Sequence, residues 1–315
     1  MGEPLIIEDK KIYPGENKII DLQIARLTSG TWIDMPVYVY RSKKPGPVLL
    51  FMGGLHGDEV NGVEIVRRLI VEKTLEKLNV GSVLAIPILN VFGFLNFSRD
   101  VTDGKDVNRS FPGSASGSLA SRVAYRFTND ILPVIDVGID FHTGGGRRTN
   151  YPQVRYWPED KKAEEMAQAF GVKYLLHSKL IPKSFRYQAA KMKKPIVVYE
   201  GGESLRFDEL AIEEGIKGAK RVLHHFNMKE EYILPETEKL LFSKSSWIRA
   251  KRSGMFRLFA RSGEKVSRNK LLGIINDPYN QYEIKVYAHK SGHIIGHNNS
   301  PVVYQGDPLF HIGLL

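Results

Sequence analysis

The chain has 315 residues, of which 42% are hydrophobic and 25% are charged, a composition typical of a globular protein with one large and one small domain. It contains no cysteine, which excludes disulfide bonds, thiolate metal ligands and a cysteine nucleophile. The formal net charge of +10 is spread along the chain without a nucleic-acid motif, no apolar run approaches the ~20 residues of a membrane span, and no secretory signal opens the chain, so we expect a cytoplasmic protein that binds neither nucleic acid nor membrane.

The first part of the chain predicts a strand–helix–strand unit of the parallel type. Residues 37–41 alternate as in a strand, and the apolar runs at 48–52 and 82–87 predict strands buried on both faces. Between them, residues 60–77 carry apolar side chains at helical spacing. The polar loop that follows 48–52 lies at the carboxyl end of a strand, where α/β proteins place their ligands.

The same alternation of strands and helices continues to about residue 226. Residues 134–141 and 195–199 are apolar and predict strands, while residues 161–170 and 207–226 predict helices. Polar residues follow each of these strands. We therefore expect an α/β domain whose strand ends share one functional edge.

From about residue 240 the helical spacing stops and short β-like runs separated by glycine turns take over. Residues 254–275 resemble residues 292–312, which indicates a duplicated small β-sandwich of about 75 residues. We place the boundary near 235–245, which gives domains 1–240 and 241–315.

A metal site is indicated by three residues at predicted strand ends. His56 and Glu59 lie three positions apart in a glycine-rich turn, and His142 ends a distant strand. Two imidazoles and one carboxylate are the ligands of a catalytic zinc that keeps one position open for water. Glu64 falls inside the predicted helix and is a poorer ligand. The alternative is a plain helix N-terminus at which Asp58 and Glu59 are favourable charges.

A hydrolase of this type also needs a base and groups that bind the substrate. Glu200 follows an apolar strand and is the candidate general base, with Glu203 as its competitor. Arg109 with Asn108 would bind an anionic end of the substrate, unless Arg109 forms a surface ion pair. Arg99 is a candidate for polarising the scissile carbonyl.

Two further features leave alternatives open. Asp140 either orients a metal-bound histidine through a hydrogen bond or caps the glycine loop that follows. Arg147 and Arg148 form either a mobile anion clamp or, as we favour, a solvated loop.

Four motifs in order resemble the succinylglutamate desuccinylase/aspartoacylase family of zinc-carboxypeptidase-like hydrolases. They lie at residues 45–62, 106–113, 140–142 and 200–202. The resemblance implies an α/β/α catalytic domain with a mixed central sheet. It also implies a small N-acyl amino acid or similar carboxylate-bearing amide as substrate.

The resemblance also implies roles for particular residues. It implies one zinc ion per chain on His56, Glu59 and His142, and Glu200 as general base. Asn108 with Arg109 would bind the substrate carboxylate, and Arg99 matches the carbonyl-polarising arginine of the family. The acyl pocket has no motif of its own, and Arg186 with Tyr187 are our candidates for it.

The C-terminal region resembles the biotinyl/lipoyl-like barrel-sandwich of this family. Its expected tip, residues 276–280, lacks the lysine that a carrier domain needs, so we expect no attached biotin or lipoate. We expect this region to shield the site or to mediate homo-oligomerisation.

We therefore predict zinc-dependent hydrolysis of the amide bond of an N-acyl amino acid or a similar amide. A carboxypeptidase acting on short peptides is the alternative within the same chemistry. A non-enzymatic binding module is the alternative from another class.

Overall fold

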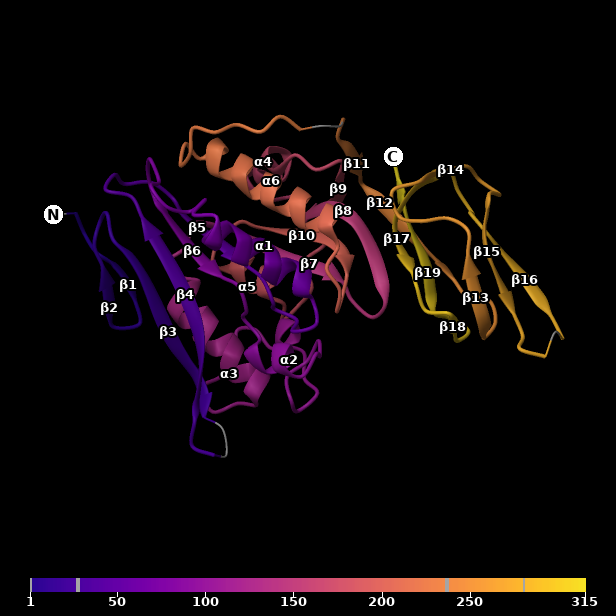
Figure 1. Cartoon of the computed structure of the whole chain (residues 1–315), viewed down its shortest axis with the longest axis horizontal. Coiled ribbons are helices and arrows are strands. Elements are labelled where there is room, and N and C mark those ends of the chain that lie inside the picture. The colour runs from indigo at the N-terminus through magenta and orange to yellow at the C-terminus, as the bar shows by residue number, and fades with distance from the viewer. Residues whose placement is uncertain (1, 27–28, 236–237, 280) are drawn as a thin grey trace.

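The protein is described by a computed structural model over residues 2–26, 29–235, 238–279 and 281–315, and most of its strands belong to one large mixed sheet (Figure 1). Up to residue 239 the elements are β1 (Leu5–Ile7), β2 (Lys10–Ile12), β3 (Asn17–Arg26), β4 (Trp32–Arg41), β5 (Val48–Met52), α1 (Val60–Val71), β6 (Ser82–Ile86), α2 (Val91–Leu95), η1 (Val107–Arg109), α3 (Leu119–Arg126), η2 (Phe127–Ile131), β7 (Val137–Gly144), β8 (Arg148–Tyr156), α4 (Lys161–Phe170), β9 (Tyr174–His177), α5 (Phe185–Lys191), β10 (Ile196–Glu203) and α6 (Glu209–His225). The remaining strands are β11 (Leu240–Phe242), β12 (Lys244–Arg249), β13 (Gly254–Leu258), β14 (Lys265–Val266), β15 (Leu271–Asn276), β16 (Glu283–Tyr287), β17 (Gly292–Asn298), β18 (Val302–Val303) and β19 (Pro308–Leu314).

The centre of the sheet is parallel and its flanks are antiparallel. Strands β6, β5, β7 and β10 run parallel in that order, β4 and β3 follow antiparallel beyond β6, and β8 follows antiparallel beyond β10. Every residue of β6 and β7 is buried, as expected for strands covered on both faces. The predicted mixed α/β fold is confirmed.

Helices cover both faces of this sheet (Figure 1). Helices α1, α4 and α6 contribute Leu69, Phe170 and Val222 to one apolar core, and α3 and α5 contribute Val123 and Phe185 to the other. The layers therefore hold the ends of β5, β7 and β10 rigidly, and these ends carry the polar residues of interest. Within the described ranges, no helix is long and apolar enough to cross a membrane.

Several predicted elements have different bounds in the structure. The strand predicted at 195–199, for example, is β10 at Ile196–Glu203, so Glu200 lies within the strand rather than after it. Helix α1 ends at Val71 rather than at residue 77, because the chain turns at Lys73, which has a left-handed backbone with φ of 57°. Leu75 is fully buried in this turn, so apolar spacing continues past the end of the helix. Strand β7 covers residues 137–144 rather than 134–141, since the preceding residues follow the π-helical turn η2.

The C-terminal strands form two antiparallel layers around their own core. One layer has the order β16-β15-β13-β18, and the other contains β12, β19, β17 and β14. The expected duplication is visible in the pairing, since β13 pairs with β15 and β18 while β17 pairs with β19 and β14. The division at residue 240 stays a prediction, and Asn280 of the expected tip lies outside the described residues.

The C-terminal layers are joined to the central sheet through β17. Strand β17 pairs antiparallel with the first residues of β8, at Arg148 to Asn150. The rest of β8 pairs on the same side with β9, and its other side pairs with β10. Strand β8 therefore connects the C-terminal strands with the strand that carries Glu200 (Figure 1).

Candidate metal centre and active site

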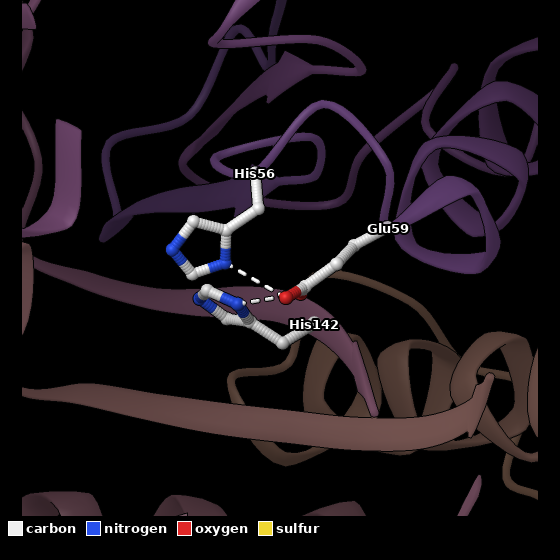
Figure 2. A group of neighbouring side chains, drawn as sticks. All are labelled: His56, Glu59 and His142. Atoms are coloured by element: carbon white, nitrogen blue, oxygen red, sulfur yellow. Dashed lines mark hydrogen bonds and ion pairs between the residues drawn. The ribbon is translucent and has the colours of Figure 1, made fainter. Parts of the chain in front are cut away.

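Three side chains converge at the carboxyl ends of β5 and β7 (Figure 2). His56 lies in the loop after β5, Glu59 is the residue that precedes α1, and His142 lies near the end of β7. Nδ1 of His56 lies 2.8 Å from Oε1 of Glu59, and Nδ1 of His142 lies 2.8 Å from Oε2 of the same carboxylate. All three residues are buried, and their candidate ligand atoms lie within 4.8 Å of one another.

Backbone packing holds this turn in place. A side chain at Gly57 would overlap the Gly93–Phe94 peptide at about 2 Å, so only glycine fits between His56 and α2. The backbone amide of Thr143 donates a hydrogen bond of 2.9 Å to Glu59. The loop after β5 and the end of β7 are therefore held against each other.

The outer nitrogen of each imidazole faces an aspartate. Nε2 of His142 lies 2.7 Å from Oδ2 of Asp140, and Nε2 of His56 lies 3.4 Å from Oδ1 of Asp106. The contact between Nε2 of His142 and Asp140 leaves Nδ1 of that ring free to bind a cation once Nδ1 has lost its own proton. A proton on Nδ1 of each imidazole would bridge it to Glu59, and a metal ion bound at this place would replace these protons.

The electrostatics of the group also fit a cation. Burial opposes a charged imidazole, but the carboxylates of Asp140 and Glu59 override it and raise the pKa of His142 well above its usual value. Burial would likewise raise the pKa of Glu59, yet the two imidazoles hold it well below its usual range. The carboxylates therefore favour a positive charge at this place, and two nitrogens with one carboxylate are a ligand set that zinc accepts.

The three residues lie at the wall of a cavity of about 260 Å³. The other charged residues that line it are Arg99, Arg109, Asp140, Arg148, Arg155, Arg186 and Glu200. Five of these seven side chains are arginines, so the cavity suits an anionic ligand.

Glu200 lies inside this cavity, beside the candidate metal ligands. Its neighbour across the β10–β7 ladder is His142. One carboxylate oxygen of Glu200 accepts a hydrogen bond from Asn150, and the other lies 2.9 Å from Nη1 of Arg155. Glu203, in contrast, is not among the cavity-lining residues and accepts a hydrogen bond from Asn299 instead. This placement supports Glu200 over Glu203 as the candidate base.

Asn108 and Arg109 line the cavity from the short helix η1. The side-chain oxygen of Asn108 accepts a hydrogen bond of 2.9 Å from the backbone of Phe185. Arg109 donates to the carbonyl of Asn108, and its closest carboxylate, Asp106, is 3.9 Å away. The guanidinium of Arg109 is therefore only loosely paired and half exposed, as a ligand-binding group would be.

Arg99 lies directly against the candidate metal ligands. Its guanidinium is 3.0 Å from Asp106, 3.2 Å from Nδ1 of His56 and 3.4 Å from Glu59. A guanidinium in this position can donate a hydrogen bond to a substrate carbonyl oxygen that binds beside the candidate metal ligands.

Several cavity residues were not predicted or were predicted differently. Arg148 begins strand β8 and lines the cavity, rather than lying in a solvated loop, while Arg147 is exposed. Arg186 lines the cavity and Tyr187 does not; burial, with Arg155 nearby, lowers the pKa of Arg186 to about 10. Trp247 was not predicted at all.

Trp247 brings the C-terminal region into the cavity wall. Its ring stacks on His311 at 4.4 Å between centroids, and the guanidinium of Arg148 lies over it at 5.9 Å. No motif surrounds Trp247 in the sequence, and only the fold brings β12 to this place.

The chain is similar to known proteins. A model of the succinylglutamate desuccinylase/aspartoacylase catalytic domain matches residues 45–226. N-alpha-acetyl-L-2,4-diaminobutyric acid deacetylase from Halomonas elongata is 28% identical over 257 residues, which cover 77% of this chain and 74% of that protein.

Solved structures share the fold over the whole chain. A succinylglutamate desuccinylase from Silicibacter sp. TM1040 is 22% identical, covers 99% of this chain and 98% of its own, and has a TM-score of 0.84. The product-bound ectoine utilization protein EutE (DoeB) from Ruegeria pomeroyi is also 22% identical, covers 100% of both chains, and has a TM-score of 0.86.

Proposed function

This chain belongs to the succinylglutamate desuccinylase/aspartoacylase family, and on that premise we propose that it is a zinc-dependent amidohydrolase that removes the acyl group from a small N-acyl amino acid. The observation that carries the proposal is the convergence of two imidazole Nδ1 atoms on Glu59 in the wall of an arginine-rich cavity that also contains Glu200.

His56, Glu59 and His142 would hold one zinc ion per chain. When bound, zinc supplies an acidified water and a Lewis acid for the amide carbonyl. Asp140, which lies 2.7 Å from Nε2 of His142, would keep that imidazole in the orientation that binds a metal, while Asp106 lies 3.4 Å from Nε2 of His56.

The remaining residues position the substrate and move its protons. Arg109 binds the free carboxylate, and Arg99 donates a hydrogen bond to the carbonyl oxygen as negative charge develops there. Glu200 accepts a proton from the attacking water and delivers it to the nitrogen as the C–N bond breaks. The products are a free carboxylic acid and an amino acid with a free amine.

The size of the cavity favours small substrates over peptides. A cavity of about 260 Å³ lies below the usual range for drug-sized ligands, and Trp247 closes part of its wall. The curated relative from Halomonas elongata is named for an N-acetyl diamino acid, which suggests the first compound to assay.

The test is release of free amine from a panel of N-acyl amino acids by zinc-loaded protein. The panel combines acetyl, formyl and succinyl groups with acidic, basic and neutral amino acids, and includes N-alpha-acetyl-2,4-diaminobutyrate and short peptides. Glu200→Gln should retain zinc and lose about 10²- to 10⁴-fold in kcat. Glu203→Gln is the matched control and should keep most of the activity. No turnover across the panel by protein with zinc bound would contradict the proposal.

A further inference from the structure

Both oxygens of the Glu200 carboxylate are held by one neighbouring strand. Nδ2 of Asn150 donates a hydrogen bond to Oε2, and Nη1 of Arg155 lies 2.9 Å from Oε1. Asn150 and Arg155 both belong to β8, which pairs antiparallel with β10 and changes register between Glu200 and Gly202. This arrangement holds the carboxylate from both sides.

Asn150 is fixed on its other side by the C-terminal region. In the β8–β17 ladder, Asn150 lies opposite Gly296. A side-chain carbon at Gly296 would lie only 2.5 Å from Oδ1 of Asn150, so the amide rests directly over this glycine. Asn150 is 7% exposed. Its position therefore depends on β17 as well as on β8.

The orientation of this amide follows from its partners. An ionised carboxylate can only accept hydrogen bonds, so the NH₂ group must face Glu200 and the oxygen must face Gly296. The terminal torsion of a glutamate side chain is broad, and the carboxylate would rotate freely without such contacts. Arg155 alone would hold one oxygen and leave the plane of the group undefined.

We propose that Asn150 is a positioning residue for Glu200, and that strand β17 sets its position through Gly296. The proposal rests on the role of Glu200 proposed above. A general base works only within hydrogen-bond reach of the proton that it removes, and misplacement by about 1 Å can cost on the order of 10²-fold in rate. The C-terminal strands thereby contribute to the chemical step, besides lining the cavity.

The first experiment compares Asn150→Ala and Asn150→Asp with wild type. We expect kcat to fall about 10- to 100-fold in Asn150→Ala, with KM and bound zinc nearly unchanged. Asn150→Asp keeps the volume but replaces the donor with a second carboxylate, and should lose at least as much kcat. A purely structural role would make the Asp variant the better one, and that result would overturn the proposal.

The second experiment is a double-mutant cycle. In a Glu200→Gln background, Asn150→Ala should change kcat by less than about 2-fold, because the two residues act as one unit. Independent losses that multiply would contradict the proposal. If Glu200→Gln were itself active, the assigned base would be wrong; if it is inactive while Asn150→Ala turns over normally, only the positioning role fails.

The third experiment tests the contribution of β17. Gly296→Ala pushes against Asn150 and should reduce kcat with little change in KM. Gly292→Ala on the same strand is the matched control, since its new carbon would meet Gly313 of β19 rather than Asn150. We expect Gly292→Ala to lower the unfolding temperature while the folded protein keeps its kcat. Equal kcat in Gly296→Ala and wild type would show that β17 does not position Glu200 through Asn150.

Discussion

Lowering the pH from 7 to 5 should destabilise the folded chain through His311, a buried residue of β19. Its ring stacks on Trp247, and its Nε2 atom lies 2.8 Å from Oγ of Ser245. Burial, together with the positive charges of Arg155 and Arg148, lowers the pKa of His311 from 6.5 to about 3.

The sign and size of the effect follow from proton linkage. The folded pKa lies below the unfolded one, so the unfolded chain binds more protons between pH 6.5 and 3, and stability is lost as the pH falls through this window. The free energy of unfolding should therefore drop by about 2 kcal/mol between pH 7 and pH 5 from His311 alone.

The assay is urea unfolding followed by circular dichroism at both pH values. His311→Gln cannot take up this proton, so its loss of stability between pH 7 and pH 5 should be about 2 kcal/mol smaller than that of wild type. His289→Gln removes an exposed histidine from the same region and should keep the wild-type pH dependence. Identical pH dependence in wild type and His311→Gln would refute the reasoning.

Four further predictions concern the cavity. Chelation should abolish amine release, and zinc should restore it. Asp140→Asn should weaken zinc binding about 10- to 100-fold in a chelator competition, and an unchanged zinc affinity would exclude the role of Asp140 in orienting His142. Arg109→Met should raise KM for N-acyl amino acids about 10- to 100-fold with little change in kcat, since it removes a charge-assisted contact made before and during the reaction; a loss confined to kcat would contradict carboxylate binding. Trp247→Ala should improve kcat/KM for bulky acyl groups relative to acetyl in a competition assay, and an unchanged ratio would show that this wall does not select the acyl group.

The elements that sequence analysis predicted best are those with a clear pattern in their own sequence. The run at Val48–Met52 is wholly apolar because the strand is covered on both faces, and the structure has a strand with these bounds. The helix Lys161–Phe170 also has its predicted bounds. Asp160 caps its start, and Gly171 ends it in a left-handed conformation. The convergence of His56, Glu59 and His142 followed from their places at strand ends.

The parts that escaped prediction depend on contacts between distant segments. Strand β8 mixes polar residues with Pro152, so its sequence shows neither a clean alternation nor an apolar run. The partners of Glu200 on this strand, Asn150 and Arg155, carry no motif, and neither does Trp247. In the sequence, Asp106 is only one residue of the motif at 106–113. Its position 3.4 Å from Nε2 of His56 depends on how the loop after β6 folds back.

The pairing of β8 with three other strands also determines how the protein can be truncated. A chain ended at residue 240 would lack β17 and expose the backbone N–H and C=O groups of β8 at Arg148 to Asn150. An uncovered strand edge of this kind recruits strands from other copies, which leads to edge-to-edge aggregation. The catalytic part expressed alone should therefore accumulate in inclusion bodies, and its recovery would need a segment that covers this edge.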